Sequence, residues 1–179
     1  GSDDLNAAWS PDSQSVVFAA SDNRNVAAYA ETSTHLYAVS INGGEPKPLT
    51  NGQDSYSGPK FSHDGKTLFC ALSPDSEKAY NLNRIASFSW PSVTDRKIIT
   101  AGFDRAPSSF ALTPDGKTIY LLAEDAGHEK LFTVPASGGQ VTLAMDMTRG
   151  VYTGLAIPAK ASAVFANWES ATSPAEVVR

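Results

Sequence analysis

Three aspartates recur in this chain in similar surroundings and at nearly constant spacing. Asp12, Asp64 and Asp115 lie 52 and 51 residues apart, and each follows a serine or threonine by two residues. Carboxylates are ligands for calcium, so a metal site is one interpretation of the pattern. Each aspartate stands alone in a short turn-like sequence, however, and not in a loop of alternating oxygen ligands. We therefore expect it to stabilise a turn through its own backbone.

The other residues with chemical potential are scattered. His35, His63 and His128 occur in different repeats and share no metal-ligand spacing, so we expect one strand-edge residue and two turn residues. Glu124-Asp125 resembles a carboxylate pair, but its polar surroundings predict a solvated hairpin. No Gly-x-Ser-x-Gly sequence occurs among the 13 glycines, so no nucleophile is assigned. We therefore predict no catalytic, cofactor-binding or metal-binding residue and no cofactor.

The bulk composition limits the possible partners. A hydrophobic content of 41% and a charged content of 18% are typical of a globular protein. The net charge of −5 argues against a nucleic-acid or anionic membrane partner, and no apolar run approaches the ~18 residues of a membrane span. Cys70 is the single cysteine and is expected to be a small buried apolar residue. Gly1-Ser2 is typical of a cloning scar, which predicts an excised piece of a longer protein.

The elements that position these residues come from a repeat of about fifty residues. Similar sequences begin at Trp9, Phe61 and Leu112, and a degenerate copy begins at Ala156. In the third repeat, strands are expected over 108–112, 118–123, 130–134 and 141–143. Turns at Pro114-Asp115-Gly116, over 124–129 and at Gly138-Gly139 separate them. Four antiparallel strands joined by short turns form one blade of a β-propeller.

The remaining repeats follow the same plan and predict an all-β fold, a β-propeller fragment of about four blades. The blades are placed at 3–50, 51–100, 101–148 and 149–179, the last one incomplete. Their strands are expected at 6–10, 15–20, 35–41 and 47–50; at 60–62, 67–72, 82–88 and 97–100; and at 151–157, 163–167 and 175–179. Loops at 21–34 and 73–80 are long and polar. Tyr29, Tyr56, Tyr80 and Trp90 fall in expected loops and are candidates for a substrate-facing rim.

Several of these sequences are similar to a known family. The Ser-Pro-Asp-Gly-Lys-type turns and the Gly-Gly sequences before the fourth strands resemble TolB-like, WD40-like propeller repeats. The succession Gly102-Phe103-Asp104-Arg105, then the turn at Pro114, then Ser173-Pro174-Ala175-Glu176 resembles the amino-terminal propeller of prolyl oligopeptidase family serine peptidases. Within that family, the succession resembles the dipeptidyl-peptidase and acylaminoacyl-peptidase-like branch. We expect Asp104-Arg105 to be a structural anchor between blades.

The resemblance implies a non-catalytic propeller that controls the access of short peptides to a separate α/β-hydrolase domain, which this chain lacks. The parent protein would be a serine-type peptidase, although no Glu-Glu pair for holding a peptide amino terminus occurs here. The alternative is a TolB-like periplasmic interaction propeller with no enzymatic parent. The resemblance to this family implies export or a periplasmic location, and a cytoplasmic location is left open. Uncovered blade faces predict self-association of the isolated chain, most simply as a two-fold dimer.

Overall fold

The computed structural model describes residues 6–21, 24–26, 28–30, 32–76, 80–160 and 163–179. Fifteen β-strands and one short 3-10 helix, η1 (Arg24–Val26), are found among them. The strands form four antiparallel sheets, three with four strands and the last with three. This result confirms the all-β fold class with four blades. No helix in this part of the chain has the length and apolar composition that a membrane span requires.

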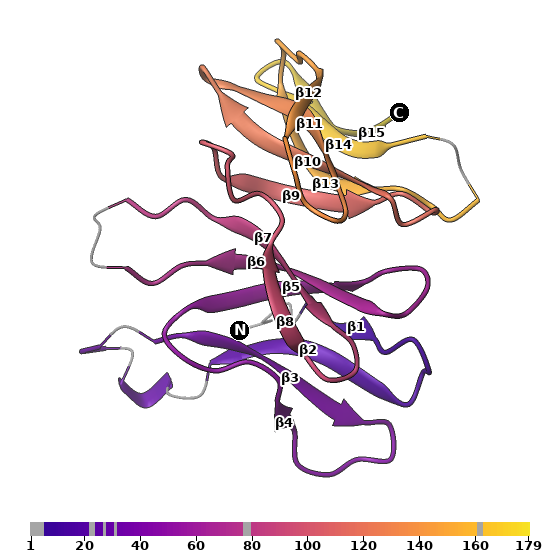
Figure 1. The fold of residues 1–179 in the computed structure, drawn as a ribbon. Helices are drawn as coiled ribbons and strands as arrows, with labels where there is room; N and C mark the ends of the chain where they lie inside the picture. The colour runs from indigo at the N-terminus through magenta and orange to yellow at the C-terminus, as the bar shows by residue number, and fades with distance from the viewer. Residues whose placement is uncertain (1–5, 22–23, 27, 31, 77–79, 161–162) are drawn as a thin grey trace. The chain divides into compact units, whose positions relative to one another are not determined.

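The chain divides into two compact units, which Figure 1 shows with their strands labelled. The first unit comprises residues 1–81 and 85–97 and holds two sheets. One sheet contains β1 (Ala8–Trp9), β2 (Ser15–Ser21), β3 (Thr34–Ser40) and β4 (Lys47–Pro48), in that order. The other contains β5 (Ser55–Phe61), β6 (Thr67–Ser73), β7 (Arg84–Ser89) and β8 (Thr94–Ile98).

The second unit comprises residues 82–84 and 98–179 and has the same plan. Its complete sheet contains β9 (Pro107–Leu112), β10 (Thr118–Asp125), β11 (His128–Pro135) and β12 (Thr142–Met145). Its three-stranded sheet contains β13 (Val151–Ala156), β14 (Phe165–Ser170) and β15 (Ser173–Val178). Strand β13 contacts β9, β10 and β11, so the two sheets of this unit pack on each other.

Central strands supply most of the buried apolar side chains, as expected for sheets covered on both faces. Strand β6 buries Leu68, Phe69, Cys70 and Leu72. Strand β10 buries Ile119 and the three consecutive residues Leu121 to Ala123. Burial raises the pKa of the Cys70 thiol to about 12, because the thiolate would lose its hydration. Cys70 is therefore an inert part of the core, as predicted.

Two expected strands of the second blade are wrong in their bounds. Strand β5 begins at Ser55 and not at the expected Lys60, and a bulge between Ser57 and Lys60 accommodates Gly58 and Pro59 within it. Gly58 has a φ of +57° there. Strand β8 ends at Ile98, and the following turn buries Ile99, which had been expected to continue the strand. The long loop expected over 21–34 contains η1 and lies partly outside the described residues.

The hairpin between β10 and β11 is also shorter than expected. Glu124 and Asp125 are the last residues of β10, and the turn consists of Ala126 and Gly127 alone. Both turn residues have positive φ, +55° and +80°, which is the geometry of a tight type I′ hairpin. Glu124 and Asp125 therefore lie in this hairpin as expected, but in its strand and not in its loop, and Glu124 is exposed whereas Asp125 is half-buried.

Candidate functional site

The three recurring aspartates build the same turn three times. The hydroxyl of Ser10 donates to Asp12 Oδ1 at 2.6 Å, and the same contact at 2.6 Å joins Ser62 to Asp64. Thr113 and Asp115 repeat it at 2.6 Å. Each aspartate also accepts the backbone N–H two residues ahead, at 3.0 to 3.1 Å. These contacts confirm the turn interpretation.

These hydrogen bonds also explain the electrostatics of the turns. The hydroxyl that donates to each carboxylate, and then the backbone N–H, lower the pKa of Asp12, Asp64 and Asp115 below the usual 3.8. The same hydroxyl accepts a backbone N–H five residues ahead, from Ser15, Thr67 and Thr118 respectively. In the described part of the chain, no group of three or more histidine, cysteine or acidic side chains is placed to hold a metal ion.

The residue type at one position of the repeated turn differs among the three copies, and this difference gives a prediction about stability. Gly65 and Gly116 both have a φ of +68°, but the first turn has Ser13 at +57°. A side chain in this region is strained, so Ser13→Gly should raise the free energy of unfolding by about 0.5–1 kcal/mol, as measured by urea denaturation.

The matched control for this change is the reverse substitution in the third turn. A Cβ at Gly116 would meet nothing within 4 Å, so Gly116→Ser tests backbone strain alone and should destabilise by about 1 kcal/mol. A Ser13→Gly protein that is no more stable than the parent, beside a destabilised Gly116→Ser protein, would contradict the strain at Ser13.

A network of charged side chains fixes the segment that leads into β9. Arg105 binds Asp104, and its Nη2 atom lies 2.7 Å from Asp125 Oδ1. Lys130 Nζ lies 3.0 Å from Asp125 Oδ2 and 3.1 Å from Asp146 Oδ1. The ion pair expected for Asp104-Arg105 is therefore present. Asp125 lies in β10 and Lys130 in β11, so the network ties the segment of Arg105 to the blade that follows it.

Aromatic and backbone contacts hold the same segment. Phe103 packs edge-to-face on Phe132 of β11, with ring centroids 5.0 Å apart. Arg84 donates to the backbone carbonyl of Phe103 and, at 3.5 Å, to that of Arg105. A hollow of about 490 Å³ beside these residues is lined by Phe103, Arg105, Asp125 and Phe132. Because Arg105 and Lys130 already pair with Asp125, the geometry indicates a structural anchor.

This network predicts a pH dependence. Arg105 first, and then Lys130, lower the pKa of Asp125 below 3.8. A carboxyl with a lowered folded-state pKa stabilises the protein above its unfolded pKa and loses that contribution as the pH falls through the folded value. Asp125→Asn should therefore lower the urea midpoint by a constant amount at neutral pH, and the difference should shrink below pH ~4.

Glu124→Gln is the matched control for Asp125→Asn. Glu124 precedes Asp125 in β10 and points to the opposite face of the sheet. It should leave the pH dependence of the urea midpoint as in the parent protein. An Asp125→Asn difference that persists unchanged at pH ~3 would show that the carboxylate charge is not what stabilises this region.

The four aromatic residues proposed for a substrate-facing rim do not form one group. Tyr56 lies in β5 and is 3% exposed, so its placement in a loop was wrong. Tyr29 and Tyr80 are 84% and 92% exposed, in the β2–β3 and β6–β7 connections. Trp90 lies in the β7–β8 turn and packs edge-to-face on Phe61 at 4.8 Å. Successive connections of an antiparallel sheet lie at opposite ends, so Trp90 and Tyr80 are separated by the length of β7.

Tyr29 and Tyr80 belong to loops that meet at one end of the first unit. The segment between β4 and β5 contacts both loops: Gln53 O accepts from the Ser33 hydroxyl at 2.9 Å, and Asp54 Oδ1 accepts from the Asp75 backbone N–H at 2.9 Å. We call this end, defined by Tyr29, Ser33, Asp54, Asp75 and Tyr80, the loop end. Tyr29 and Tyr80 are both exposed there, on long connections.

Side chains beneath the loop end form a charged and aromatic contact that the sequence did not reveal. Arg96 Nη1 donates to Asp54 Oδ2 at 2.6 Å and to the Tyr56 hydroxyl at 2.7 Å. Burial raises the pKa of Tyr56, and the ring of Tyr56 packs on Phe88 at 5.8 Å. Arg96 lies on β8 and Tyr56 on β5, so the contact spans the sheet from its last strand to its first. It holds Asp54 in place for the contact with Asp75.

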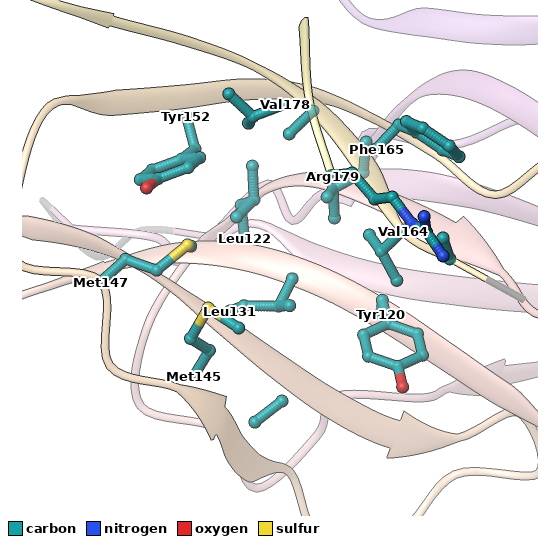
Figure 2. A pocket seen from close by; sticks show the side chains of 14 residues that line it. Tyr120, Leu122, Leu131, Met145, Met147, Tyr152, Val164, Phe165, Val178 and Arg179 are labelled. Atoms are coloured by element: carbon teal, nitrogen blue, oxygen red, sulfur yellow. The ribbon is translucent and has the colours of Figure 1, made fainter.

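A separate apolar pocket lies in the second unit, as Figure 2 shows. Its volume is about 550 Å³, and its walls come from both sheets of the unit. Met145 and Met147 lie on one side, and Arg179 lies beside Val164 and Phe165 on the other. Arg179 is the one charged residue of the described lining. The rest of the described lining is apolar apart from Tyr120 and Tyr152, a composition suited to packing against apolar groups.

Comparisons with known proteins show which proteins this chain resembles. No protein-family model matches the chain. The Aspergillus clavatus protein named "Probable dipeptidyl-peptidase 5" is 33% identical over 118 residues, and the match covers 59% of this chain and 16% of that protein. Dipeptidyl-peptidase 5 of Porphyromonas gingivalis is 26% identical over 136 residues, 74% of this chain and 19% of that protein. The chain thus spans less than a fifth of the length of these relatives.

Solved structures agree on the fold. A puromycin-hydrolysing peptidase from Mycobacterium tuberculosis superposes with a TM-score of 0.72 at 12% identity, over 97% of this chain and 28% of that one. TolB from Acinetobacter baumannii superposes with a TM-score of 0.67 at 18% identity, over 96% of this chain and 39% of that one. The chain has the fold of β-propeller blades. Together with the sequence matches, this confirms the resemblance to the propellers of dipeptidyl-peptidase and acylaminoacyl-peptidase-like proteins.

Proposed function

We propose that this chain is the non-catalytic propeller portion of a serine peptidase and shapes the access of short peptides to a separate α/β-hydrolase domain. The sequence similarity to dipeptidyl-peptidase 5 carries this proposal, because it spans 118 residues of repeats that hold no nucleophile elbow. The chemistry of peptide hydrolysis would belong to the hydrolase domain, and the chain would supply a rigid wall around the entrance. Export to the periplasm is the location that fits such a parent.

The loop end is the surface of the first unit that best suits this role. Functional contacts of a β-scaffold are commonly carried by its longer loops, because short turns have no spare side chains to offer. Tyr29 and Tyr80 present large rings that combine apolar contact with a hydroxyl, a combination that binds peptides with little loss of side-chain entropy. At the other end of the same sheets, the Asp12 and Asp64 turns are short and their carboxylates are already hydrogen-bonded.

A second function has its own support. The superposition on TolB favours a periplasmic interaction propeller without an enzymatic parent. The two proposals differ in what the complete gene encodes. A strand-turn-helix with Gly-x-Ser-x-Gly downstream supports the peptidase, because this turn exposes a serine nucleophile. A stop codon soon after the last blade supports the interaction protein and rejects the peptidase.

Activity-based labelling tests the proposal on protein. The product of the complete gene and the isolated 179-residue chain are treated with a fluorophosphonate probe and then given chromogenic dipeptide and acylaminoacyl substrates. We expect labelling and turnover for the complete product only, since acylation needs a serine activated by a base within hydrogen-bond reach. Turnover by the isolated chain that a serine-directed inhibitor abolishes would reject the non-catalytic assignment.

Control of access is tested separately in the complete product. Tyr29→Ser combined with Tyr80→Ser should change the ratio of kcat/KM for a dipeptide substrate to that for a peptide of roughly 30 residues by several-fold. Ile41→Ser is the matched control, because Ile41 is also an exposed apolar side chain but lies between β3 and β4, at the opposite end of its sheet. Equal ratios in all three proteins would reject the role of the loop end.

A further inference from the structure

The first unit contains two Asn-Gly pairs whose backbone amides differ in their hydrogen bonding. Asn42-Gly43 lies between β3 and β4, and Asn51-Gly52 lies between β4 and β5. We infer that Asn51-Gly52 is a site of spontaneous covalent modification, at which the asparagine is converted to isoaspartate and aspartate. The inference does not depend on the peptidase proposal, since the reaction needs only the local backbone and water.

The reaction uses atoms of the two residues and water. The backbone nitrogen of Gly52 gives its proton to solvent base and attacks Cγ of Asn51. The new C–N bond closes a five-membered succinimide, and the side-chain nitrogen takes a proton from solvent and leaves as ammonia. No catalyst is needed, because nucleophile and carbonyl are held in neighbouring residues. Water then opens the ring: attack at the main-chain carbonyl gives isoaspartate, whose peptide link runs through Cγ, and attack at Cγ gives aspartate.

Hydrogen bonding of the glycine amides separates the two pairs. The Gly43 N–H donates to the Ser40 carbonyl at 2.9 Å and closes a turn. Among the residues that the structure describes, no acceptor is found for the Gly52 N–H. A backbone nitrogen must lose its proton to attack, so a hydrogen bond that has to break first slows the reaction, by roughly two- to tenfold for a bond of ordinary strength. Asn51 should therefore react faster than Asn42.

Exposure and space are the same at both pairs, so they do not obscure this difference. All four residues are exposed. A Cβ built on Gly52 or on Gly43 would meet nothing within 4 Å, which leaves room for either asparagine side chain to approach the next nitrogen. Both pairs lie beyond the ends of strands, whereas neighbouring blades of a propeller pack on the faces of its sheets. Blade packing therefore does not cover them.

The modification should loosen the loop end, because the chain is fixed on both sides of the pair. On one side, Thr50 is 8% exposed and its Oγ1 atom accepts the Leu36 N–H at 2.9 Å. On the other side, Asp54 Oδ1 accepts the Asp75 N–H at 2.9 Å. Isoaspartate adds one carbon atom to the main chain and a negative charge. Since Thr50 is held in the core and Asp54 is only half-buried, the displacement should fall on the contact between Asp54 and Asp75.

Peptide mapping by mass spectrometry tests the site on the 179-residue chain, incubated at mildly alkaline pH and physiological temperature. Isoaspartate is identified by methyl transfer from S-adenosylmethionine with a protein isoaspartyl methyltransferase. We expect Asn51 to be modified several-fold faster than Asn42. Asn51→Gln should abolish methylation at this position, because closure would need a six-membered ring. In denaturing urea the two pairs should react at similar rates, because the hydrogen bond of Gly43 is then lost. A folded chain in which Asn51 reacts no faster than Asn42, or a rate difference that persists in urea, would overturn the assignment.

Hydrogen exchange measures the effect on the loop end. Chain that carries isoaspartate, purified by anion exchange and verified by peptide mapping, should exchange the Asp75 amide several-fold faster than the parent protein. Asn51→Asp is the matched control, because it adds the charge without lengthening the main chain, and it should exchange as the parent does. Unchanged exchange at Asp75 in the modified chain, or equally fast exchange in Asn51→Asp, would overturn the role of the added main-chain length.

Discussion

Replacement of Leu122 by alanine should lower the free energy of unfolding by about 3 kcal/mol. Leu122 is 0% exposed and packs with Ala111, Leu131, Met147 and Leu155 in the core of the second unit. The substitution removes one methine and two methyl groups with their contacts and leaves a void. Leu122 also lines the apolar pocket, so the void joins an existing space. We therefore expect a cost nearer the lower than the upper end of the range for buried leucines.

Urea denaturation followed by circular dichroism measures this cost. Leu143→Ala is the matched control, because Leu143 lies in β12, the outer strand of the same sheet, and is 52% exposed. It should lower the free energy of unfolding by less than about 1 kcal/mol. Similar losses for the two substitutions would contradict the packing described for β10, and would place the main core of this unit elsewhere.

Gly150→Ala should have an effect of similar size for a different reason. Gly150 has a φ of +70°, and an added Cβ would lie 2.5 Å from the Glu169 carbonyl oxygen and 2.7 Å from Trp168 Cε2. The left-handed backbone costs about 1–2 kcal/mol with a side chain, and the overlap adds about 1–3 kcal/mol. We expect a total of about 3 kcal/mol in urea denaturation. The indole should also shift, breaking the bond that Trp168 Nε1 donates to Arg149 O at 3.0 Å.

Gly127→Ala separates the two causes. Gly127 has a φ of +80°, but a Cβ there would meet nothing within 4 Å, so only the backbone cost of about 1 kcal/mol should appear. Indole fluorescence gives a second measurement, since Trp168 should become more exposed in Gly150→Ala and stay unchanged in Gly127→Ala. Equal destabilisation of the two proteins, with no change in fluorescence, would show that Trp168 moves aside without cost.

Much of the fold could be predicted because the repeats are locally specified. Asp64 and Asp115 are followed by a glycine that supplies positive φ, and the serine or threonine two residues before each closes the turn. These contacts join residues at most five apart, so they leave a direct mark on the sequence. The prediction failed at the bulge in β5, where Gly58 and Pro59 lie and the strand begins earlier than expected. Gly154, at a φ of +63°, lies at a comparable irregularity in β13, although the expected bounds of that strand agree with the structure.

The candidate site was less predictable, because its contacts join residues far apart in sequence. Tyr56 reads as an exposed loop residue, yet Arg96 reaches it from 40 residues away. Asp125 was expected to be solvated, but it pairs with Arg105, which lies in the segment before β9, and with Lys130 of β11. Local propensity carries no information on such pairs, because ion pairing is decided by which strands become neighbours.

The sequence by itself determined the repeat, its turns and the all-β fold, since hydrogen bonds within a few residues and strand alternation are properties of local segments. It also excluded a nucleophile elbow from this chain. Only the tertiary structure decided that Tyr29 and Tyr80 lie at one end of the first unit while Trp90 lies at the other. It likewise decided which face of β1–β3 is buried. Both outcomes depend on how whole sheets pack, because burial belongs to pairs of surfaces and not to single segments.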